Sequence, residues 1–118
     1  MGKKEPNRNK DESLINPILI IKSGPHKNKK WKLPNDTFVI VGRDIQMSNI
    51  VVSNDSRISK QHMVVQYDYS RNCFVIIDVS TNGVYINGAR IKKHTSFEVA
   101  SGTQINIANG ACLLELRI

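Results

Sequence analysis

The sequence lacks any apolar run long enough to cross a lipid bilayer. Its apolar runs, such as ILII at 18–21 and FVIV at 38–41, have at most five residues, whereas a spanning helix needs about 20. The first ten residues, MGKKEPNRNK, are charged and polar, so they do not resemble a secretory signal peptide. No window shows sustained helical periodicity behind an N-cap. We therefore expect a soluble intracellular protein with no membrane partner and with strands in place of helices.

Signatures of metal and cofactor sites are also absent. The chain has only two cysteines, Cys73 and Cys112, and its three histidines are scattered, so no metal-ligand spacing occurs. Each cysteine lies in an apolar strand-like run. Although the two could pair, an intracellular setting favours buried free thiols. The glycine-containing segments match neither a Walker loop nor a dinucleotide fingerprint. We expect no metal and no cofactor.

Acidic residues are missing from one stretch of the chain. Residues 13–35 carry five lysines and no acid, and they hold most of the formal net charge of +7. The basic segment 27–32, with Trp31 as a stacking ring, suggests a nucleic-acid-binding patch. The simpler interpretation is a Gly-Pro turn that leads into a strand whose lysines face water and whose Trp31 packs inward. We favour the simpler one because the excess charge is local and does not extend over the domain.

Short apolar runs separated by turn signals fill the rest of the chain. Residues 1–16 are polar and predict a disordered basic leader. From residue 17 onward the runs are rich in Val, Ile, Phe and Tyr, and several alternate apolar with polar residues. About eleven short strands at this spacing predict an all-β fold, an antiparallel β-sandwich over residues 17–118. The runs are 18–21, 31–33, 37–41, 50–52, 62–67, 73–78, 84–86, 89–91, 96–100, 103–108 and 111–118.

The segment DVSTNGVYINGARI, residues 78–91, contains two Asn-Gly pairs. Asn87-Gly88 lies between two apolar runs and is the preferred pair for a two-residue turn in which both residues need positive φ. It therefore predicts a β-hairpin. Asn82-Gly83 lies in a five-residue loop, which is longer than chain reversal requires.

The loop 79–83 is expected to present the hydroxyls of Ser80 and Thr81 and the carboxamide of Asn82 at one end of the sandwich. Loops held on a rigid scaffold in this way often carry function. The sequence therefore predicts a binding site that includes this loop.

Two upstream turns offer groups of matching chemistry. Gly42 and Arg43 follow one apolar run, and the Arg43 guanidinium is suited to a bidentate contact with phosphate. A later turn presents Arg57, Ser59 and Lys60. Together with the loop 79–83, these turns supply hydrogen-bond donors and few carboxylate acceptors, a set that fits a phosphate dianion.

These residues, in this order and spacing, resemble the forkhead-associated (FHA) domain family. The resemblance covers residues 17–118. It implies an eleven-stranded β-sandwich whose loops at one end bind phosphothreonine in an extended peptide, without catalysis. The motifs that carry it are Gly42-Arg43, Ser59-x-x-His62, Ser80-Thr81-Asn82-Gly83 and Asn87-Gly88.

The resemblance also implies a role for each phosphopeptide-binding residue. Arg43 would anchor the phosphate or the peptide backbone near it, and Ser59 would donate its hydroxyl to a phosphate oxygen. Lys60 would add a charged phosphate contact, and Thr81 would act at the phosphate or the neighbouring loop. Asn82 would hydrogen-bond the peptide main chain.

Other positions are implied to support or tune the site. His62 would be a brace beneath the loops and not a base. Arg57 resembles the position that reads the third residue after the phosphothreonine, and an arginine there suggests an acidic residue in the ligand. The positions implied to shape the backbone are Gly42, Gly83, Asn87 and Gly88.

The resemblance implies a threonine-phosphorylated protein as the partner. It places the module in a larger signalling, cell-cycle or DNA-damage-response protein, whose remainder can include a catalytic domain such as a kinase. The family's tendency and the basic leader favour a nuclear over a cytoplasmic location. We expect the isolated domain to be monomeric.

Three other functions compete with phosphopeptide binding. Nucleic-acid binding would use residues 27–32. A hydrolase would use Ser59, His62 and Asp78 as a triad, but Ser59 lacks the Gly-x-Ser-x-Gly elbow. A purely structural docking module would have lost its pocket residues, and this chain retains them.

Overall fold

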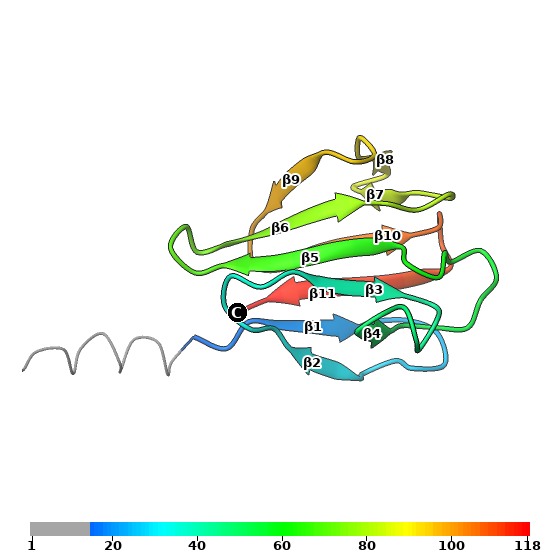
Figure 1. Ribbon diagram of the computed structural model, residues 1–118, viewed down its shortest axis with the longest axis horizontal. Helices are drawn as coiled ribbons and strands as arrows, with labels where there is room; N and C mark the ends of the chain where they lie inside the picture. The colour runs from blue at the N-terminus through cyan, green and yellow to red at the C-terminus, as the bar shows by residue number, and fades with distance from the viewer. Residues whose placement is uncertain (1–14) are drawn as a thin grey trace, which may run out of the picture.

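Eleven short strands form two sheets that pack face to face in the computed structural model, which describes residues 15–118 (Figure 1). Every predicted apolar run overlaps one strand, so the predicted β-sandwich is confirmed. The predicted leader falls almost entirely on residues 1–14, outside the described part of the chain. The strands are β1 (Ile18–Ile21), β2 (Lys30–Lys32), β3 (Val39–Gly42), β4 (Ile50–Val51), β5 (Met63–Asp68), β6 (Cys73–Asp78), β7 (Val84–Ile86), β8 (Ala89–Arg90), β9 (Ser96–Val99), β10 (Thr103–Ile107) and β11 (Cys112–Arg117).

The six-stranded sheet has the order β2-β1-β11-β10-β7-β8, and the five-stranded sheet has the order β4-β3-β5-β6-β9. The prediction of a purely antiparallel sandwich needs one correction, because β3 and β4 pair in parallel. Residues 43–49 fold back beside β3, where the Asn49 amide donates to the Ile40 carbonyl at 2.8 Å and the Asn49 side chain accepts from the Ile40 amide at 2.8 Å. This return allows β4 to run in the same direction as β3.

The core lies between the sheets and follows the period-2 pattern of the strands. In β5, Met63, Val65 and Tyr67 are fully buried, and the residues between them are half-buried. The Tyr67 ring packs against Phe74 of β6 with centroids 5.2 Å apart. Within residues 15–118, no helix has the length and apolar character to span a membrane.

The two cysteines are free thiols in different surroundings. Cys112 is buried in the core, and this burial raises the pKa of its thiol to about 11. Cys73 is only half-buried, which corrects the expectation that both thiols are buried. It lies at the start of β6, opposite Asp68 at the end of β5, so the end of the strand pair leaves it partly open to solvent.

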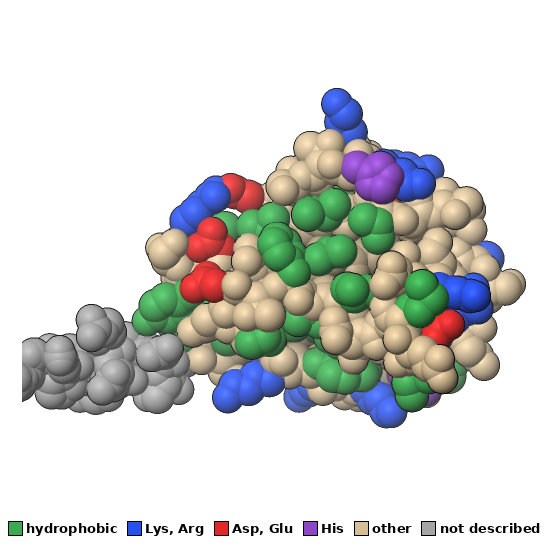
Figure 2. Space-filling view, in the orientation of Figure 1, with side chains coloured by type: hydrophobic (Ala, Val, Ile, Leu, Met, Phe, Trp, Pro, Cys, Tyr) green, Lys and Arg blue, Asp and Glu red, His purple; other side chains and the backbone are tan. Residues whose placement is uncertain are grey.

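Apolar side chains also extend over the outer face of the five-stranded sheet. Ile40, Val64 and Ile77 are cross-strand partners in β3, β5 and β6, and all three are half-buried. Phe38, just before β3, is 49% exposed. Figure 2 shows apolar side chains distributed across this face.

The basic segment adopts the simpler of its two predicted arrangements. Trp31 is half-buried and packs against the core, opposite Leu19 of β1. Lys30 and Lys32, its neighbours in β2, are exposed. The tryptophan therefore supports the fold, and the lysines face solvent on an edge strand.

Three loops gather at one end of the sandwich. They are the loop after β3 (43–49), the turn before β5 (52–62) and the loop after β6 (79–83). In Figure 1 they lie at the right-hand end of β3, β5 and β6. The topology therefore brings together the three segments from which the binding residues were predicted.

The β7–β8 hairpin provides a test of the turn assignment. Asn87 and Gly88 have φ of 51° and 81°, as the predicted two-residue turn requires. We expect Asn87→Ala to lower the free energy of unfolding by about 1 kcal/mol, since alanine tolerates the left-handed region poorly. Urea denaturation measures the change, and Asn87→Gly should retain most of the stability. An alanine variant as stable as the parent would contradict this account of the turn.

Candidate functional site

Arg43 joins the end of β3 to the turn before β5. Its amide donates to the carbonyl oxygens of Ser59 and Lys60 at 3.1 and 3.3 Å, and its Nε donates to the Ile58 carbonyl at 2.7 Å. The side chain is half-buried, and no described residue hydrogen-bonds its terminal nitrogens. The guanidinium is therefore fixed at one edge while two donor groups remain available to a ligand.

Gly42 permits this close approach of two backbones. A Cβ at residue 42 would overlap the Lys60 carbonyl group and crowd the Ser48 hydroxyl. Ser48 Oγ donates to the same Lys60 oxygen at 2.5 Å. Glycine is needed at residue 42 because a side chain would collide with the neighbouring backbone. The position of Lys60 therefore depends on Gly42.

His62 lies fully buried beneath the loops and connects two of them. Its Nδ1 accepts from the Ser59 amide at 3.0 Å, and its Nε2 donates to the Gly83 carbonyl at 2.8 Å. Burial lowers the pKa of His62, although its bond to Gly83 and the Asp78 charge oppose the shift. Both ring nitrogens are engaged by backbone groups, so His62 is placed as a brace and does not activate the Ser59 hydroxyl.

The loop after β6 is organised around a buried carboxylate. Asp78 Oδ1 accepts from the Ser80 amide at 2.8 Å and from the Ser80 hydroxyl at 2.6 Å. Ser80 Oγ in turn accepts from the Gly83 amide at 2.8 Å. The expectation that Ser80 presents its hydroxyl to a ligand is therefore wrong, because the buried carboxylate requires that donor.

Thr81 and Asn82 of this loop are exposed beside Ser59. The Thr81 amide donates to Ser59 Oγ at 3.1 Å, and Asn82 Nδ2 donates to the Arg57 carbonyl at 2.9 Å. Among residues 15–118 the Ser59 hydroxyl hydrogen has no acceptor. Ser59, Thr81 and Asn82 thus form one surface, with Lys60 exposed next to them.

Arg57 borders this surface but is already paired. Its guanidinium binds the Asp55 carboxylate at 2.7 Å, and the Arg57 side chain and amide hold the pKa of Asp55 down to about 2. Arg57, Asn82 and Tyr85 help to line a shallow hollow of about 370 Å³. An acidic ligand residue would have to compete with Asp55 for Arg57.

Arg90 is a supporting residue that the sequence reasoning missed. Its terminal nitrogen donates to the Thr81 carbonyl at 3.3 Å, and its Nε lies 3.6 Å from Asp78 Oδ2, a buried oxygen with no hydrogen-bond partner among the described residues. The sequence did offer a signal for Arg90. A two-residue turn at Asn87-Gly88 pairs residue 90 with Tyr85, which lies close to the loop after β6.

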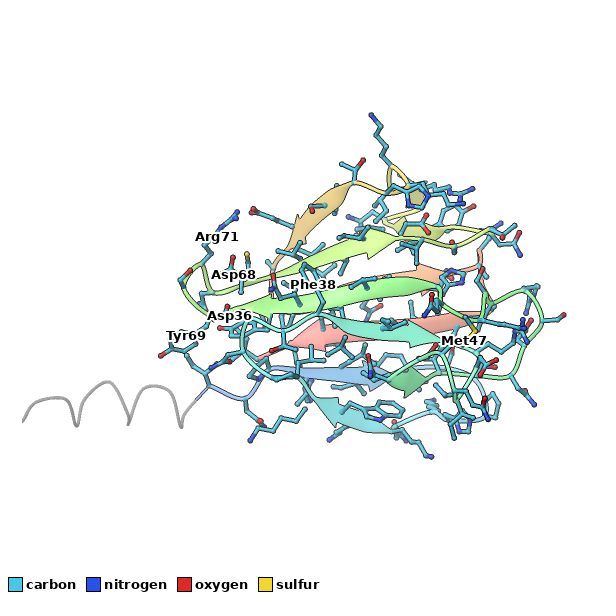
Figure 3. All side chains as sticks on the ribbon, in the orientation of Figure 1. Asp36, Phe38, Met47, Asp68, Tyr69 and Arg71 are labelled. Atoms are coloured by element: carbon cyan, nitrogen blue, oxygen red, sulfur yellow. The ribbon has the colours of Figure 1, made fainter. Side chains whose placement is uncertain are left out.

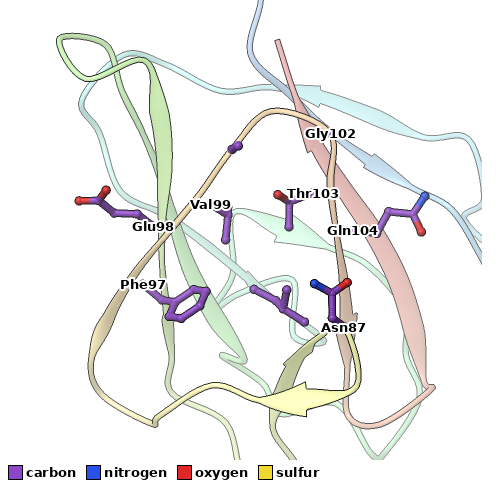
Figure 4. Close-up of a pocket in the computed structure, with 9 residues that line it drawn as sticks. Asn87, Phe97, Glu98, Val99, Gly102, Thr103 and Gln104 are labelled. Carbon is purple, nitrogen blue, oxygen red and sulfur yellow. The ribbon is translucent and has the colours of Figure 1, made fainter.

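Not every predicted support residue lies at the loops. Asn87 lines a different hollow, of about 490 Å³, between β9 and β10. Figure 4 shows Phe97 and Val99 on one side of this hollow and Thr103 and Gln104 on the other. Asn87 and Gly88 therefore support the site only indirectly, through the hairpin that positions Arg90.

The sequence matches the FHA domain family over residues 39–108. This match covers more than half of the chain, and the protein belongs to the FHA family, whose domains are non-catalytic interaction modules. No curated protein matches the sequence.

Solved structures of FHA domains share the fold. The FHA domain of the CT664 protein from Chlamydia trachomatis is 25% identical, with a TM-score of 0.76 over 88% of this chain and 98% of that one. The N-terminal FHA domain of Rad53p from S. cerevisiae, solved with a phosphothreonine peptide, is 21% identical, with a TM-score of 0.74 over 88% and 94%. The MEK1 FHA domain, solved with a phosphothreonine peptide of HOP1, is 21% identical, with a TM-score of 0.70 over 86% and 95%.

Proposed function

We propose that this FHA domain binds threonine-phosphorylated segments of a partner protein at the surface formed by its three loops. The phosphate contacts are assigned to Arg43, Ser59 and Lys60, with Thr81 beside them. Asn82 is assigned to the peptide main chain. The observation that carries the proposal is the convergence of available donors from separate loops on one rigid surface.

The carboxylates of these loops do not oppose the proposal. Asp44 accepts from the Gln46 amide at 2.7 Å, Asp55 is paired with Arg57, and Asp78 is buried. Each carboxylate therefore has a structural partner or lies out of reach. The groups that face solvent at the surface are chiefly donors, which is the chemistry that a dianion requires.

The energetic consequence is a large preference for the phosphorylated ligand. A hydrogen bond to a charged group contributes about 1.5–3 kcal/mol, so several converging on one phosphate favour the phosphopeptide by roughly a thousandfold. An extended peptide laid across loop tips buries little area, so the expected dissociation constant is on the order of micromolar.

The fold relationship to Rad53p and to other domains solved with phosphothreonine peptides supports the proposal. It also supports placing the module in a signalling or checkpoint protein. A degenerate phosphothreonine peptide library identifies a ligand, and calorimetry then compares that peptide with its unphosphorylated and phosphoserine counterparts. Equal binding of the phosphorylated and unphosphorylated peptides would refute the proposal.

A comparison of Lys60 with a distant lysine tests whether a local charged contact or the net charge of the protein attracts the peptide. Lys60→Ala is expected to weaken phosphopeptide binding about tenfold through loss of a charged contact. Lys29, exposed between β1 and β2, has the same charge, and Lys29→Ala should change the affinity less than about twofold at physiological salt. Calorimetric titrations of both variants measure the difference. Equal losses would indicate that the net charge of the protein, and not a phosphate site, attracts the peptide.

A further inference from the structure

The loop after β3 exposes two large apolar side chains. Ile45 is 81% exposed and Met47 is 44% exposed. Exposed apolar surface contributes little to the stability of the fold, because the hydrophobic gain comes from removing such surface from water. The pair lies on the segment that begins at Arg43, the assigned phosphate anchor.

This loop is held firmly at its base. The Asp44 carbonyl accepts from the amides of Met47 and Ser48 at 3.1 and 2.9 Å. Gln61 Nε2 donates to the Met47 carbonyl at 2.9 Å, and Ser48 Oγ donates to the Lys60 carbonyl. The backbone that carries the two apolar side chains is therefore preorganised, which reduces the entropic cost of binding through them.

The position of the pair relative to the phosphate donors follows from the segment 57–61. At one end of this segment, the Arg57 carbonyl accepts a hydrogen bond from the Asn82 side chain. At the other end, the Gln61 side chain donates to the Met47 carbonyl. Ser59 and Lys60 lie between these ends. Four residue steps cover at most about 14 Å, so a peptide centred on the phosphate reaches both flanks within about four residues.

The two flanks of the phosphate donors differ in chemistry. Arg57, Asn82 and the polar hollow beside them form one flank, and Ile45 and Met47 form the other. Figure 3 shows Met47 at the loop end of the sandwich, whereas Asp36, Asp68 and Arg71 gather at the opposite end. The apolar pair therefore belongs to a loop at the same end of the sandwich as the proposed peptide surface.

We propose that Ile45 and Met47 form an apolar subsite for one large apolar residue of the phosphothreonine peptide. With Arg57 assigned to the third residue after the phosphothreonine, the subsite accepts a residue among the four that precede it. The inference rests on the proposed function and adds the ligand chemistry that this flank selects.

The test uses pairs of phosphothreonine peptides that carry leucine or serine at each of the four preceding positions. At one position, leucine is expected to bind about tenfold more tightly, within the range that an apolar pocket provides. The double variant I45S/M47S should lose that preference and retain its preference for phosphorylated over unphosphorylated peptide.

Phe38→Ser is the matched control, because Phe38 is exposed to a similar extent as Met47 but lies on the outer sheet face. It should leave the leucine preference unchanged. Phosphopeptide binding with no apolar preference at any preceding position, or an unchanged preference in I45S/M47S, would overturn the subsite and leave the proposed function standing. Absence of phosphate-dependent binding in the unsubstituted protein would overturn both.

Discussion

Arg43→Ala is expected to weaken phosphothreonine-peptide binding by about a hundredfold. The substitution removes the two donor groups available to the phosphate, and it also removes the 2.7 Å bond from Nε to the Ile58 carbonyl. Loss of charge-assisted hydrogen bonds worth about 3 kcal/mol corresponds to that change in affinity. Calorimetry measures the affinity of each protein for the phosphopeptide and for its unphosphorylated counterpart.

Two controls make the Arg43 result specific. Arg43→Lys keeps the charge but loses the planar fork, so it should recover only part of the affinity. Arg71 lies at the opposite end of the sandwich (Figure 3), where it pairs with Asp68 and Glu98, and Arg71→Ala should leave the affinity unchanged. Phosphopeptide binding that survives Arg43→Ala in full would remove the assigned anchor from the site.

His62→Ala is expected to lower the free energy of unfolding by about 3–5 kcal/mol. It leaves the Ser59 amide without its partner, removes one of the two donors to the Gly83 carbonyl, which keeps the Ala108 amide, and opens a cavity beneath the loops. The unsatisfied amide costs about 1–3 kcal/mol, and the lost bond to Gly83 and the cavity add to this cost. Denaturant unfolding measures the loss, and a change below about 1 kcal/mol would contradict the bracing role.

The same histidine makes stability depend on pH in a defined direction. Burial lowers the pKa of His62 below its ordinary 6.5, so the folded protein keeps the ring neutral at a pH where the unfolded chain takes up a proton. The unfolded state then binds more protons, and the free energy of unfolding falls as the pH drops below about 6.5. His62→Gln should flatten this slope below about pH 6.5. An equal slope in both proteins would contradict the assignment.

The strands could be predicted because each depends on local sequence. Alternating apolar residues such as Met63, Val65 and Tyr67 fix which side of β5 faces the core, and Asn87-Gly88 fixes a hairpin with its register. The parallel pairing of β3 and β4 was missed because it depends on how the loop 43–49 returns along β3. That return relies on non-local hydrogen bonds to Ile40.

The clustering of the candidate residues was predictable from the sequence, but their internal hydrogen bonding was not. Motif spacing brought Arg43, Ser59 and Asn82 to one surface, as the structure shows. The sequence did not indicate that Ser80 turns inward to satisfy Asp78, because the burial of that carboxylate arises only when the sheets pack. The pairing of Arg57 with Asp55 is local, and the Asp-x-Arg spacing offered a signal that went unused.

The most direct test of the central claim is an NMR titration of backbone amides with a phosphothreonine peptide and its unphosphorylated twin. The account predicts that the signals of Ser59, Lys60, Thr81 and Asn82 shift with the phosphorylated peptide and stay in place with the other. Similar shifts with both peptides, or shifts confined to the lysine-rich segment 27–32, would contradict it.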